Sequence, residues 1–159
     1  NILALFAEST FQDTYGSDED DIIDLAGHLT NTCLQEGNDP LVEGFWNMKG
    51  LTQDDKAKIF AQVKEITGQL FKAASSVDKI NFQPMRNAVE TFGVDFLVNA
   101  DLSVKLLEVN SYPDFKQTGG ELKSVIDDLF KAVAELIVAP KFLELDTATD
   151  SAHLLHQVL

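Results

Sequence analysis

Apolar and polar residues alternate most regularly in the middle of the chain, over residues 92–110. This alternation predicts two β-strands joined by a polar turn at residues 99–101. Asp95 lies on one face of the first strand, and a two- or four-residue loop would bring Glu108 beside it on that face. In the second strand the alternation predicts one shared face for Val104, Leu106, Glu108 and Asn110.

The polar residues of this hairpin are two carboxylates, Asp95 and Glu108, and one carboxamide, Asn110. Aliphatic side chains surround them in sequence, and burying two such charges without a cation between them would be costly. Hard oxygen ligands of this kind suit Mg²⁺ bound together with substrate phosphates. An ordinary amphipathic hairpin whose acids point to water fits the residues equally well.

A long amphipathic helix is predicted over residues 52–75, where apolar residues recur every three or four positions. Thr52 is the expected N-cap, and Asp55 three residues later resembles the acid of a capping box. The expected buried stripe consists of Ile59, Phe60, Val63, Ile66, Leu70, Phe71 and Ala74.

The flanking segments are less regular. An apolar run at residues 2–7 predicts a strand buried on both faces, and residues 36–50 read as a loop. A short helix is expected from Pro84 to Thr91, and a third helix over residues 121–138, with Pro140 ending it. Together these elements predict an α+β fold with an antiparallel sheet flanked by helices.

Composition narrows the class of protein. The 159 residues suffice for one domain with a core, and no apolar run is long enough for a membrane span. Twelve basic against 26 acidic residues give a net charge of −14, which disfavours nucleic acid and anionic lipid as partners. Any bound phosphate would need Mg²⁺ or positive groups from elsewhere. The single Cys33 excludes an internal disulfide and favours a reducing, cytoplasmic setting.

Three motifs in fixed order point to a family: HLTN at residues 28–31, FGVDF at 92–96 and LEVN at 107–110. Their combination resembles the tubulin–tyrosine ligase family, which belongs to the ATP-grasp superfamily. The resemblance covers residues 1–140 as the C-terminal part of such a domain and leaves 141–159 as a tail or short helix. Because the chain starts within an apolar run, we expect it to be part of a longer protein.

The resemblance implies an enzyme that uses ATP and Mg²⁺ to join a carboxylate to an amine through an acyl phosphate. Asp95, Glu108 and Asn110 match the family's metal-binding and nucleotide-binding positions. Thr30 and Asn31 match residues near the phosphates and the acceptor, which implies a catalytic and cofactor-binding role for both. The implied partners are ATP and a protein acceptor, either a tubulin tail or another protein.

One position departs from the family pattern. The family usually has a basic residue in a run like Arg-Phe-Ala before the HLTN motif, whereas this chain has Leu5 followed by Phe6 and Ala7. Leucine cannot steady a phosphate or carboxylate as a guanidinium does. The loop at residues 110–119 looks most like fungal and plant members. Leu5, the strong acidity and the long loops favour the alternative of a weak or inactive ATP-grasp module that binds proteins. The resemblance to fungal members found in processing bodies implies mRNA-decapping proteins as its partners.

Overall fold

The structure is a computed structural model that describes residues 2–11, 25–30, 41–77, 79–86, 88–113, 115, 123–144, 151, 153 and 155–158. The strands are β1 (Leu3–Leu5), β2 (Val42–Gly44), β3 (Gly93–Val98) and β4 (Val104–Asn110). The helices are a 3₁₀ turn (Leu25–Gly27), α1 (Gln53–Val77), α2 (Lys123–Val133), a π-helical segment (Ala134–Val138) and α3 (Ala139–Phe142). β1 pairs with β2 and β3 pairs with β4, each as a two-stranded antiparallel sheet. This mixed architecture agrees with the predicted α+β class.

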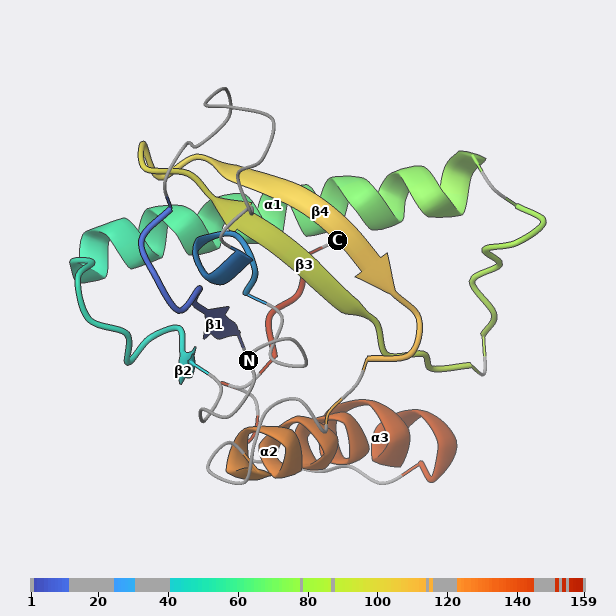
Figure 1. Cartoon of the computed structure of the whole chain (residues 1–159). Coiled ribbons are helices and arrows are strands. Elements are labelled where there is room, and N and C mark those ends of the chain that lie inside the picture. The colour runs from blue at the N-terminus through green and yellow to red at the C-terminus, as the bar shows by residue number, and fades with distance from the viewer. Residues whose placement is uncertain are drawn as a thin grey trace.

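The β3–β4 hairpin lies across α1, and α2 with α3 forms a separate helical layer (Figure 1). The contact between hairpin and α1 carries the core, in which Phe45, Ile59 and Val104 are buried. The partly buried residues packed on this cluster are Ile2, Met48, Leu51, Phe60, Val63, Ile66, Phe96 and Leu102. None of the helices in the described parts of the chain is both long and apolar enough to cross a bilayer.

The long helix α1 confirms the helical prediction, including its capping box. The Asp55 backbone N–H donates to Thr52 Oγ1 at 3.1 Å, and the Thr52 backbone N–H donates to Asp55 Oδ2 at 3.3 Å. The Thr52 hydroxyl also donates to Asp55 Oδ2 at 2.6 Å, and these Thr52 hydrogen bonds hold the pKa of the Asp55 carboxyl below its ordinary value. The residues of the predicted stripe are all buried or half-buried.

A lysine on the first turn of α1 ties the preceding loop to the helix. Lys56 is buried, and its ammonium group donates to the Trp46 carbonyl at 2.8 Å and the Met48 carbonyl at 2.6 Å. These charge-assisted hydrogen bonds satisfy a cation that would be costly to bury alone. The loop that follows β2 is thereby fixed against the core.

The predicted strand at residues 2–7 is shorter and more open than expected. Only Leu3–Leu5 is a strand, and Leu5 is 45% exposed, so burial on both faces was a wrong prediction. The strand has one partner, β2, which lies in the segment that the sequence predicted as loop. A three-residue strand of Val, Glu and Gly carries too little periodicity to be recognised.

The helix predicted from Pro84 to Thr91 is absent from the described residues 79–86 and 88–92. The rings of Phe71, Phe82 and Phe92 pack together with centroids 5.4 to 6.1 Å apart, so both ends of the segment are held on α1. Between these ends the described side chains are nearly all exposed. A short helix with no face to bury is marginal in water, and the segment remains irregular.

Pro140 does not end the last helix as predicted, because a π-helical segment precedes it. The Ala139 backbone N–H donates to the Ala134 carbonyl, five residues back instead of four. This wider turn lets the proline ring enter the helix at a first-turn position, where its missing N–H costs little. The helical run therefore continues to Phe142.

Candidate metal centre on the hairpin

The register of β3 and β4 places Asp95 directly opposite Glu108 and Gly93 directly opposite Asn110. Opposed residues of an antiparallel pair project on the same face, with Cβ atoms roughly 4.5–5.5 Å apart. The prediction that the two carboxylates project side by side from adjacent strands is therefore confirmed.

A β-bulge creates this arrangement. Phe96 pairs with Leu106, but Asp95, which precedes Phe96 in β3, pairs with Glu108. Leu107 is therefore an extra residue of β4 without a partner position in β3. In an unbroken ladder Asp95 would oppose Leu107, and Glu108 would share the face of Val94. One additional residue in β4 thus turns Glu108 to the face of Asp95.

The bulge also corrects one prediction about β4. Val104 and Leu106 do not share a face with Glu108 and Asn110, because the strand changes sides at Leu107. Val104 is buried in the cluster that includes Ile59 of α1, so the face with Val104 packs on the helix. The acids consequently lie on the face of the hairpin that points away from α1.

The turn of the hairpin also differs from the predicted two- or four-residue loop, since residues 99–103 lie between the last paired residues. The Asn99 N–H donates to the Ser103 carbonyl at 2.9 Å, and the Leu102 N–H donates to the Asn99 carbonyl at 2.9 Å. Leu102 has a φ of 65°, a left-handed conformation that is unfavourable for a leucine. The five-residue loop and the extra residue Leu107 together bring Asp95 opposite Glu108. A loop with an even number of residues would give the same pair without a bulge.

A glutamine of α1 holds this turn in place. The Gln62 side chain donates from Nε2 to the Leu102 carbonyl at 2.9 Å and accepts at Oε1 from the Val104 N–H at 3.2 Å. It therefore pairs with the hairpin as another strand would, which fixes the register at the turn end relative to the helix.

At the opposite end of the hairpin, the amide of Asn110 bridges the two acids. Asn110 Nδ2 donates to Asp95 Oδ2 at 3.2 Å and to Glu108 Oε1 at 3.1 Å. Desolvation, a hydrogen bond with Glu108 and the charge of Glu108 raise the pKa of Asp95, against the lowering effect of the Asn110 hydrogen bond. The structure thus brings all three predicted metal ligands together.

This donor set fits a hard divalent cation. Two carboxylates compete for one region of space, and the partial positive charge of the Asn110 amide group offsets some of their repulsion. A cation would do so more completely, with the amide turned to present its oxygen. Within the described residues, no group of three or more His, Cys, Asp or Glu side chains is arranged to hold a metal ion, and the oxygen-bearing side chain next to the two acids is the amide of Asn110.

Comparison of the sequence with known proteins assigns the chain to a family. The model of the tubulin–tyrosine ligase family matches residues 1–147. This chain belongs to the tubulin–tyrosine ligase family. It is 45% identical over 154 residues to a Saccharomyces cerevisiae protein named "probable tubulin–tyrosine ligase", covering 94% of this chain and 20% of that protein.

Two further relatives are similar to most of this chain. A Schizosaccharomyces pombe protein, also named "probable tubulin–tyrosine ligase", is 48% identical over 120 residues, which are 74% of this chain and 29% of that protein. A human protein named "inactive polyglycylase" is 26% identical over 133 residues, which are 72% of this chain and 19% of that protein. The chain therefore spans only 19% to 29% of the length of these three relatives.

The other predicted site residues of this family member are placed only in part. Thr30 is exposed at the end of the segment that contains the 3₁₀ turn, and Asn31 lies outside the described residues. Residues 9–11 hold the segment, through the Ser9 N–H donating to the Ala26 carbonyl at 3.2 Å and an edge-on contact of the Phe11 and His28 rings. The position of Thr30 next to phosphates therefore stays a prediction.

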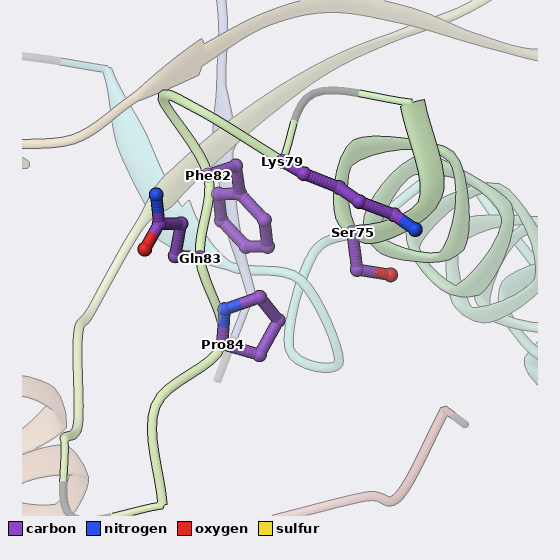
Figure 2. A pocket seen from close by; sticks show the side chains of 5 residues that line it. All are labelled: Ser75, Lys79, Phe82, Gln83 and Pro84. Atoms are coloured by element: carbon purple, nitrogen blue, oxygen red, sulfur yellow. The ribbon is translucent and has the colours of Figure 1, made fainter.

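A shallow hollow of about 330 Å³ lies beyond the end of α1, lined by Ser75, Lys79, Phe82, Gln83 and Pro84 (Figure 2). It contains none of the residues that match family motifs. Two of its polar side chains are engaged within the chain, since Ser75 Oγ donates to the Lys72 carbonyl and Gln83 Nε2 donates to the Ile80 carbonyl. The hollow lacks the converging polar groups of a ligand site, and the hairpin remains the better candidate.

Proposed function

We propose that this chain is the C-terminal part of an ATP-grasp domain in an ATP- and Mg²⁺-dependent carboxylate–amine ligase of the tubulin–tyrosine ligase type. The observation that supports this proposal is the direct opposition of Asp95 and Glu108, with the Asn110 amide between them. The arrangement requires a bulge and places like charges together, neither of which benefits the fold. Such costs are typical of functional positions.

In the proposed reaction, the carboxylate of one substrate takes the terminal phosphoryl group of ATP and becomes an acyl phosphate, with release of ADP. The amine of the second substrate then attacks the acyl carbon, which forms the amide bond and releases phosphate. We place this chemistry in the cytoplasm and take an amino acid and a protein tail as the two substrates, either a tubulin tail or another protein.

The chain's own residues would have separate roles. Asp95, Glu108 and Asn110 would hold Mg²⁺, which when bound offsets the charge of the phosphate oxygens. Thr30 and Asn31 would donate hydrogen bonds to a phosphoryl oxygen and orient the acceptor. Because the chain has a net charge of −14, bound phosphates would need Mg²⁺ or positive groups supplied from elsewhere in the protein.

The cation site is testable on this chain alone. Mn²⁺ titrated into the chain, followed by calorimetry, should bind with at least tenfold lower affinity in Asp95→Ala and Glu108→Ala, because each loses a charged ligand. Glu65→Ala, which removes an exposed acid of α1, should leave the affinity unchanged. Equal affinity in all four proteins would contradict the metal site.

The reaction is tested on the full-length parent protein, by ATP-dependent incorporation of labelled tyrosine into an acidic peptide. Incorporation that disappears in Asp95→Ala supports the proposal. A folded parent that binds Mn²⁺ at this site but neither consumes ATP nor labels any peptide or protein acceptor would contradict ligase activity.

The second candidate is a catalytically weak or inactive module of the same family that binds proteins, with mRNA-decapping proteins of processing bodies as proposed partners. The exposed Leu5 at the position where the family usually has a basic residue favours it, as does the relative named "inactive polyglycylase". The Leu5→Arg variant of the full-length protein separates the two. ATP-dependent labelling that is absent from the wild type and present in the variant would support the second candidate.

A further inference from the structure

The chain turns back on itself directly after the metal-ligand strand. β4 ends at Asn110, the following Ser111 and Tyr112 are exposed, and the half-buried Pro113 lies over the start of β3. The residue beneath it is Gly93, the cross-strand partner of Asn110.

Gly93 leaves space that a side chain would fill. A Cβ atom built on Gly93 would lie 3.2 Å from Pro113 Cβ, 3.7 Å from Asn110 Cβ and 3.8 Å from Pro113 Cα. The first distance is shorter than ordinary van der Waals contact, and a proline ring has little freedom to yield. Alanine at this position would therefore push Pro113 away by a few tenths of an ångström, and its Cβ would also come into van der Waals contact with Asn110.

Backbone conformation does not explain this glycine. Among the described glycines, the only one with a positive φ is Gly50, at 91°. Gly93 lies in an extended strand, where glycine costs roughly 0.5–1 kcal/mol relative to alanine. The glycine is instead explained by its surroundings, because a side chain at this position would lie too close to Pro113.

We infer that Gly93 and Pro113 form a latch that positions Asn110 against the carboxylates of Asp95 and Glu108. Both are positioning residues, since they act through Asn110 and do not themselves contact a cation. The inference builds on the proposed cation site. A strand end next to two repelling acids tends to fray, and the latch keeps the Asn110 amide within hydrogen-bond distance of both.

The test uses Gly93→Ala in the 159-residue chain, with Gly50→Ala as a matched control. Gly93→Ala should weaken Mn²⁺ binding about tenfold, as is common when a residue supporting a metal ligand is changed. Its unfolding midpoint should change little, because the better strand propensity of alanine offsets the cost of displacing Pro113. Gly50→Ala should do the opposite: its positive φ makes the fold less stable, while nothing lies within 4 Å of the added Cβ and Mn²⁺ affinity is unchanged.

A double-mutant cycle tests whether the two residues act through one contact. Pro113→Gly should weaken Mn²⁺ binding, and Gly93→Ala/Pro113→Gly should be no weaker than the worse single variant, because the latch can be lost only once. Additive losses, or full affinity in Gly93→Ala, would overturn the inference.

A second measurement decides the inference without any cation. The side-chain amide resonances of Asn110 in the wild-type chain should show slow hydrogen exchange, and exchange should be faster in Gly93→Ala and in Pro113→Gly. Absence of Mn²⁺ binding by the wild type would contradict the proposed function alone. Unchanged Asn110 resonances in both variants would overturn the latch, whatever the cation does.

Discussion

The two halves of β4 differ in their surroundings, although they belong to one seven-residue strand. Next to the turn, Val104 is 6% exposed, packs with Ile59 of α1 and has its N–H paired with Gln62. Beyond Leu107, Glu108 and Asn110 lie on the other face, away from the helix. The first half gains stability from apolar burial, and the second half places a charge opposite another charge.

The difference separates the half of the strand that is stabilised by packing from the half for which we propose cation binding. A like-charge pair directly across a sheet is destabilising, and Leu107 interrupts the ladder to create it. The anchored turn end makes this possible, because the register there is fixed independently by Gln62. Positions that break local rules without a structural benefit are the ones expected to carry function.

The largest predicted effect concerns the anchor of the turn half. Gln62→Leu keeps the side-chain size but removes both hydrogen bonds to the hairpin, to the Leu102 carbonyl and the Val104 N–H. Each partly buried group left without a partner should cost about 1–3 kcal/mol of unfolding free energy. Urea denaturation followed by circular dichroism measures this loss.

The control for this variant is Gln69→Leu on the same helix, where the amide donates only to Glu65 on the exposed side. It should change the unfolding free energy by less than about 0.5 kcal/mol. Comparable losses in both variants would mean that the glutamine of α1 does not anchor the hairpin.

The next prediction changes the number of residues between the two halves of β4. Deleting Leu107 gives an unbroken ladder in which Asp95 still opposes Glu108, so Mn²⁺ affinity should stay within about threefold of the wild type. Inserting one serine between Leu106 and Leu107, with the one-residue bulge retained, moves Glu108 opposite Val94 on the other face of the hairpin and should lower the affinity at least tenfold, or about 1.4 kcal/mol. Titration calorimetry on both variants makes the comparison, and equal losses would show that register does not position the acids.

Much of this comparison could be predicted from the sequence, but the bulge could not. The alternation over residues 92–110 and the apolar spacing of residues 52–75 were strong enough to predict the hairpin and α1. The pairing of Asp95 with Glu108 was expected from an even loop, whereas the structure reaches it with an odd loop and an extra residue. Leu107 carries no sequence signal of its own, since a leucine fits a regular strand equally well.

The remaining errors have one physical origin, which is packing between distant segments. The helix expected at Pro84 had a favourable first residue but no face to bury, and the strand at Val42–Gly44 exists because β1 is its partner. The space that Gly93 leaves for Pro113 is likewise visible only after folding. Local propensity does not contain this information.

The smallest predicted effect is a gain of stability in the binding half. Asp95→Asn removes the like charge opposite Glu108 while keeping an oxygen that accepts from Asn110. The cation-free variant should be more stable than the wild type by roughly 0.2–1 kcal/mol at neutral pH. Thermal unfolding at several pH values measures the difference.

The pH dependence follows from the raised pKa of Asp95. A carboxyl whose pKa is higher in the folded state favours folding while protonated, and this contribution is lost as pH rises from the ordinary value of 3.8 through the raised one. The advantage of Asp95→Asn should therefore be absent in acid and appear as the pH increases.

Adding cation should reverse the order of stability. A ligand at one hundred times its Kd stabilises the folded state by about 2.7 kcal/mol, more than the repulsion between two opposed carboxylates costs. Wild type should then unfold at a higher temperature than Asp95→Asn, although it is the less stable protein without cation. A variant that stays more stable at every Mn²⁺ concentration would mean that the acid pair is a defect of the hairpin and not its binding site.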